Sequence, residues 1–80
     1  MMKVAIALIY NKAVKPSFFI IEMSLEDWRK FLHGNQRVRQ EMIVPKVAPS
    51  VEESVRELVW IPLDDQNKLQ VVDESNIIKI

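Results

Sequence analysis

Two early stretches of the chain, residues 3–10 and 17–23, carry apolar residues at every second position. This period of two places alternate side chains on opposite faces of a β-strand. In the first stretch the intervening positions are apolar as well, and they include Ala5 and Ala7. Apolar residues on both faces indicate a central strand, whose small alanine side chains would let a helix approach closely. The turn-forming segment 11–16 joins the two stretches, so the sequence predicts a β-hairpin.

A helical pattern follows directly in residues 24–34, where the spacing of apolar residues changes to three and four. Ser24 is a preferred N-cap, and Trp28 and Phe31 lie on one apolar stripe. Gly34, the only glycine of the chain, can end the helix in the left-handed C′ conformation. A helix of about two turns is not stable alone in water, so we expect its stripe to pack on the sheet.

Residues 35–50 have the weakest pattern of the chain. Val38 and Val44 fall on one parity and charged residues on the other, as in a strand with one polar face. Pro45 and Pro49 cannot donate a hydrogen bond to a neighbouring strand. We therefore expect either an edge strand followed by an extended connector or a mobile loop in this segment.

The segment 50–60 fits two patterns. Its apolar residues can form a helical stripe after an N-cap at Ser50, but residues 55–61 also alternate and are rich in strand formers. We prefer the strand, because a polar turn and a returning strand over 68–72 would complete a hairpin. A further turn then precedes a short terminal strand over 77–80.

These elements predict one α+β domain over residues 1–80. Its sheet would be antiparallel with about five strands, and the helix over 24–34 would pack on one face of it. A small, partly closed β-barrel with one helix is the alternative architecture.

Composition narrows the possible functions. The chain has 80 residues, 49% of them apolar, which suffices for one small core. It contains no cysteine and one glycine, which excludes disulfides and argues against glycine-rich phosphate loops. No apolar run approaches the roughly 20 residues of a membrane span, so we expect no membrane partner. The absence of cysteine fits a reducing setting, so we expect a cytoplasmic location.

The net charge is zero, but the charges are unevenly placed. Residues 1–46 contain eight Lys/Arg and four Asp/Glu, whereas residues 47–80 contain three and seven. The two halves therefore carry net charges of about +4 and −4. This separation of charge suits association with complementary partners, including a second copy.

Few residues suggest catalytic chemistry. His33 is the only histidine, and with no cysteine present it cannot complete a zinc site, so we interpret it as a group at the helix C-terminus. The acidic pairs Asp64–Asp65 and Asp73–Glu74 lie in predicted turns, where carboxylates bond local amides. We therefore expect no enzyme, no metal and no cofactor.

The function predicted from these observations is that of a small non-enzymatic protein-interaction module. It would act by docking, as a regulator, inhibitor or assembly component, and would self-associate as a homodimer or small homo-oligomer. Exposed strand edges, at 37–44 or at 77–80, could pair with another chain. The candidate partner-binding residues are Arg37, Arg39, Met42, Lys46 and Trp60.

Nucleic-acid binding is the alternative function. Its basic face would be centred on Arg37, Arg39 and Lys46. The further members would be Lys12, Lys15, Arg29 and Lys30. The neutral net charge and the isoelectric point near 6.6 argue against it, because proteins that bind phosphate backbones are usually basic.

Overall fold

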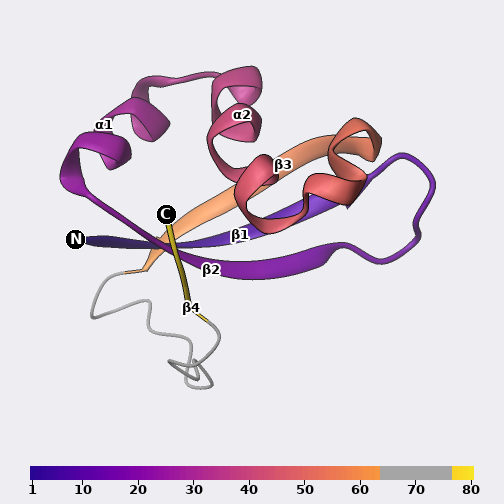
Figure 1. The fold of residues 1–80 in the computed structure, drawn as a ribbon, viewed down its shortest axis with the longest axis horizontal. Coiled ribbons are helices and arrows are strands. Elements are labelled where there is room, and N and C mark those ends of the chain that lie inside the picture. The colour runs from indigo at the N-terminus through magenta and orange to yellow at the C-terminus, as the bar shows by residue number, and fades with distance from the viewer. Residues whose placement is uncertain (64–76) are drawn as a thin grey trace.

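The computed structural model describes residues 1–63 and 77–80 (Figure 1). In chain order its elements are β1 (Met2–Tyr10), β2 (Ser17–Met23), α1 (Leu25–His33), α2 (Gln36–Val47), the 3₁₀-helix η1 (Pro49–Ser54), β3 (Val55–Leu63) and β4 (Ile77–Lys79). The predicted strand over 68–72 and the two acidic pairs lie outside the described residues.

The four described strands form one mixed sheet in the order β3-β1-β2-β4. β1 runs antiparallel to β2 and β3, while β4 runs parallel to β2. The α+β class and the central position of β1 are thus confirmed. The fully antiparallel sheet of about five strands is wrong, because β4 joins the sheet in parallel.

The β1–β2 hairpin is confirmed, with β1 beginning one residue earlier than predicted. Its register runs from Met2 opposite Met23 to Leu8 opposite Ser17. Beyond the last pair, the Tyr10 hydroxyl donates to Ser17 Oγ at 2.9 Å. β3 pairs along the other side of β1, and a bulge between Ile9 and Tyr10 interrupts that register.

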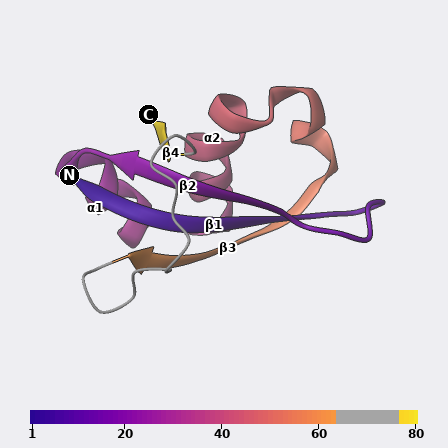
Figure 2. The same cartoon turned by 90° about the horizontal axis from the view of Figure 1, so that it is seen from below.

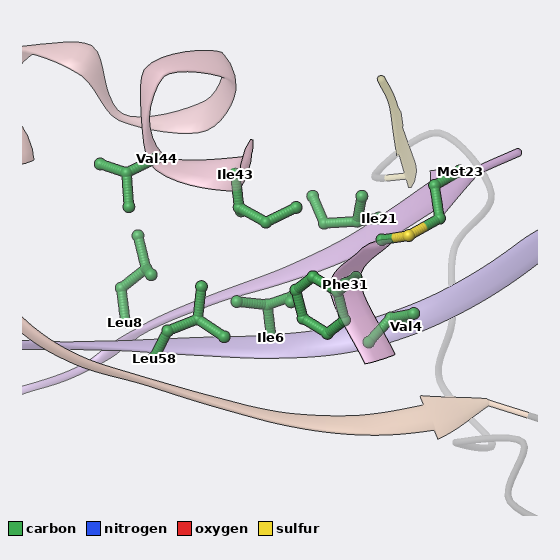
Figure 3. Packing of buried hydrophobic residues seen from close by; sticks show 9 residues of the cluster. All are labelled: Val4, Ile6, Leu8, Ile21, Met23, Phe31, Ile43, Val44 and Leu58. Carbon is green, nitrogen blue, oxygen red and sulfur yellow. The ribbon is translucent and has the colours of Figure 1, made fainter. Parts of the chain in front are cut away.

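The core is one cluster of nine buried side chains, shown in Figure 3. They are Val4, Ile6 and Leu8 of β1, Ile21 and Met23 of β2, Phe31 of α1, Ile43 and Val44 of α2, and Leu58 of β3. The helices therefore share a core with the even-numbered residues of β1. The expectation that a helix approaches over Ala5 and Ala7 is wrong, since these alanines lie on the opposite parity.

Helix α1 begins as predicted and ends differently. The Asp27 N–H donates to Ser24 Oγ at 3.1 Å, which confirms the N-cap. Gly34 has φ −81°, so the left-handed C′ conformation is wrong. The glycine is needed for space instead, because a Cβ here would lie 2.8 Å from Val38 Cγ1 and 2.9 Å from the Lys30 carbonyl oxygen.

Helix α2 replaces the edge strand or mobile loop that we predicted for residues 35–50. Asn35 caps it by accepting from the Val38 N–H at 3.0 Å. Pro45 lies in its last turn, where a missing N–H costs one bond, and the helix continues past it because the Ala48 N–H still reaches the Val44 carbonyl at 2.8 Å. The apolar residues that suggested a strand here lie on a helix instead, and two residues of that helix, Ile43 and Val44, are buried in the core.

Candidate interaction surface

The second face of the sheet carries three of the exposed large apolar side chains in the described part of the chain, Phe18, Val59 and Ile61. The register aligns Ala7 with Phe18 on β2 and with Val59 on β3. Ala5 is aligned in the same way with Ile20 and Ile61. We call this surface the open face and define it by Ala5, Ala7, Ile9, Phe18, Ile20, Val59, Ile61 and Ile77, the last aligned with Ile20.

Solvent exposure distinguishes the open face from the core. Phe18 is 76% exposed, Ile61 53% and Val59 45%, whereas the core side chains are at most 2% exposed. Among the described residues, α1 and α2 contribute buried side chains to the core that contains Val4, Ile6 and Leu8, and Figure 1 shows both helices on one side of the strands. The alanines of β1 stand lower than the large side chains on either neighbouring strand. The open face is therefore a low central stripe between two higher rows.

Charged residues bound the open face at both ends of the strands. At one end Lys3 is aligned with Glu22, which is aligned in turn with Lys79 on β4. At the other end Glu57 is aligned with Ile9. The apolar band thus runs between charged residues at both ends, and Lys12 and Lys15 of the β1–β2 connection also lie at the second end.

The outer edge of β3 is partly occupied by a side chain from α2. Gln36 Nε2 donates to the Leu58 carbonyl at 2.6 Å, and the Leu58 N–H donates to Gln36 Oε1 at 3.0 Å. One amide side chain therefore takes both hydrogen bonds that a neighbouring strand would make. Pro62 further along the edge has no N–H to offer. Such devices block pairing with another chain at an edge.

Two of the predicted partner-binding residues, Arg39 and Trp60, make internal contacts. The Arg39 guanidinium lies 5.0 Å from the Trp60 ring centroid and 5.6 Å from that of Phe31. It also donates to the carbonyls of Phe31 (2.8 Å) and Leu32 (3.1 Å). Arg39 thereby provides hydrogen-bond donors for carbonyls at the C-terminus of α1, the role that we expected for His33.

Trp60 belongs to an aromatic cluster that joins β3 to α1. Its ring lies edge-on to Phe31 at 5.2 Å and to Trp28 at 5.6 Å. Such arrangements add to the stabilisation that comes from area burial. The contacts of Trp60 therefore serve the attachment of α1, and any role in partner binding stays a prediction.

The other predicted partner-binding residues lie on α2. Arg37 is 86% exposed and pairs with Glu41 at 3.1 Å, an i,i+4 contact on the helix surface. Met42 is half-buried against the core, and Lys46 is exposed. None of these three residues belongs to the open face.

The basic residues of the nucleic-acid alternative are not gathered in one place. Lys12 and Lys15 lie in the β1–β2 connection, and Arg29 and Lys30 lie on α1. These two segments are at opposite ends of the molecule in Figures 1 and 2. Binding to nucleic acid stays a prediction, without a continuous basic face to carry it.

The residues that the sequence analysis overlooked are Gln36 and the open-face residues Phe18, Val59 and Ile61. A signal for the open face was present, because both alternating sets of residues in 3–10 are apolar and one of them had to lie away from the helices. Gln36 carries no such signal, since its role depends on where Leu58 lies in the folded chain.

Three further observations concern other kinds of site and similarity. Within residues 1–63 and 77–80, no three His, Cys, Asp or Glu residues are grouped so that they could hold a metal ion. In the same ranges no helix combines the length and apolar character needed to cross a membrane. No protein-family model, curated protein or solved structure matches this chain.

Proposed function

We propose that this protein is a non-enzymatic protein-interaction module that docks through the open face. The observation that carries the proposal is the exposure of large apolar side chains in aligned positions, with Phe18 (76% exposed) and Val59 (45% exposed) on either side of Ala7. Scattered exposed apolar residues are ordinary on soluble proteins, but contiguous apolar patches rimmed by charges are typical of interaction sites.

Docking by the face is better supported than pairing at the β3 edge. Pairing there would have to displace Gln36 from both backbone groups of Leu58. It would also meet Pro62, which lacks a donor. Contact with the open face displaces no hydrogen bond of these residues and removes apolar area from water, at about 25 cal/mol per Å².

Site-specific photo-crosslinking in the native cell tests this function. A photoreactive phenylalanine analogue at position 18 should form protein adducts, because that side chain stands on the open face. The matched control is the same analogue at Val14, which is 99% exposed but lies in the β1–β2 connection. Adducts at position 18 and not at 14 support the proposal. Equal labelling at both positions, or no protein adduct at 18, contradicts it.

A further inference from the structure

We infer that the Gln36 side chain is what keeps this protein from dimerising through the outer edge of β3, and that shortening this side chain produces such a dimer. The inference goes beyond the proposed function, because it concerns an edge of the sheet and not its open face. β3 is an edge strand of the described sheet, next to β1. An edge strand presents unpaired backbone groups with which another chain can pair.

The register of β3 shows which of its backbone groups face outward. In an antiparallel pair, the N–H and the carbonyl of one residue point together toward the partner strand, and those of the next residue point away from it. Leu58 directs both groups to Gln36, so it faces away from β1. Pro62 lies on the same parity, which suits a residue that has no N–H to offer β1. The outward positions from Leu58 to the end of β3 are therefore Leu58, Trp60 and Pro62.

Gln36 and Pro62 close two of these three positions. The Gln36 amide has the donor and the acceptor of a peptide group, and it uses both on Leu58. Pro62 has no donor. A strand that arrived at this edge would thus find a donor and an acceptor together only at Trp60. Without Gln36 it would find them at two successive outward positions, Leu58 and Trp60.

Contacts within α2 hold the Gln36 amide in this orientation. Gln36 is the first residue of α2, directly after the N-cap Asn35. Its Oε1 accepts from Gln40 Nε2 at 3.1 Å as well as from the Leu58 N–H at 3.0 Å. With the oxygen fixed by two donors, Nε2 points to the Leu58 carbonyl. Gln36 is exposed, so its amide lies where another chain would approach the edge.

Sedimentation equilibrium of Gln36→Ala and of the wild-type chain tests the inference. An alanine cannot reach Leu58, so β3 of one copy can pair with β3 of a second copy about a two-fold axis. Over about 1 μM to 1 mM, Gln36→Ala should associate at least about tenfold more tightly than the wild type. Its weight-average mass should approach twice the 9.4 kDa of one chain. Circular dichroism checks folding, and Gln36→Ser, whose side chain is also too short, serves if Gln36→Ala does not fold.

Arg37→Ala is the matched control. Arg37 follows Gln36 in the first turn of α2, but its side chain is 86% exposed and pairs with Glu41, not with β3. This variant should associate no more tightly than the wild type. If it associates as tightly as Gln36→Ala, loosening of α2 and not the loss of the Gln36 amide is the cause, and the inference is overturned.

Hydrogen exchange locates the new interface. In Gln36→Ala the amides of Leu58 and Trp60 should exchange rapidly in dilute solution and slowly at concentrations where the dimer forms. The Val59 amide faces β1 and should not depend on concentration. Association of Gln36→Ala equal to that of the wild type overturns the inference, and so does a dimer in which the Leu58 amide stays unprotected. Neither result bears on photo-crosslinking at position 18, which tests the open face.

Discussion

The two faces of the central strand β1 are almost equally apolar, yet they have different environments. Val4, Ile6 and Leu8 are buried with side chains of α1 and α2. Ala5 and Ala7 point the other way, among side chains such as Phe18 that remain largely exposed. The comparison teaches that an apolar strand pattern identifies what can be buried, while the position of the helices decides which face is buried within the chain.

The largest expected effect compares two phenylalanines on the two faces. Phe31→Ala should lower the free energy of unfolding by about 3–5 kcal/mol, because it empties a fully buried site. Phe18→Ala, the matched control, should change it by no more than about 0.5 kcal/mol in the monomer. Urea unfolding at low protein concentration measures both. Similar losses from the two variants would mean that the faces do not differ as described.

A second comparison separates two arginines of α2. Arg39→Ala should cost about 1–3 kcal/mol, since it removes hydrogen bonds from a charged group to two carbonyls of α1 and the contact with Trp60. Arg37→Ala should cost about 0–0.5 kcal/mol, because its pair with Glu41 is exposed. Thermal unfolding distinguishes them. If Arg37→Ala were the more damaging change, the structural role given to Arg39 would be wrong.

The edge of β3 offers a third test. Gln36→Ala leaves the N–H and carbonyl of Leu58 without their partner and should cost about 1–2 kcal/mol. Gln36→Glu is the matched variant, because it keeps an acceptor for the N–H but loses the donor to the carbonyl. Hydrogen exchange at the Leu58 amide should accelerate in the alanine variant and much less in the glutamate variant. Unchanged exchange in Gln36→Ala would show that the contact does not protect the edge.

The smallest effect concerns the entry to α1. Ser24→Ala should cost about 1 kcal/mol, because the Asp27 N–H loses its acceptor. Ser24→Asp should restore most of the loss, since aspartate is an equally good N-cap. Chemical denaturation measures both variants, and equal stability of Ser24→Ala and the wild type would contradict the cap.

Local patterns were sufficient for three strands and the first helix. The period of two identified β1, β2 and β3, and Ser24 located the start of α1. Two elements were interpreted wrongly. α2 was missed because Pro45 and Pro49 suggested an extended chain, although a proline near a helix C-terminus removes only one hydrogen bond. The parallel pairing of β4 was missed because neighbouring strands in sequence were expected to form hairpins.

For the candidate surface, the sequence showed that residues 3–10 are apolar on both sides, and no more than that. The alternation of side chains between two faces depends only on the backbone of one strand, so it can be predicted from a single stretch of sequence. Which side is covered depends on contacts between β1 and helices that begin more than fourteen residues later, and so does the use of Gln36 at Leu58, 22 positions away. The sequence by itself determined the strands, the first helix and the supply of apolar side chains. Only the tertiary structure decided that α1 and α2 share the core with Val4, Ile6 and Leu8 and leave Ala5 and Ala7 on the open face, because burial is set by non-local packing.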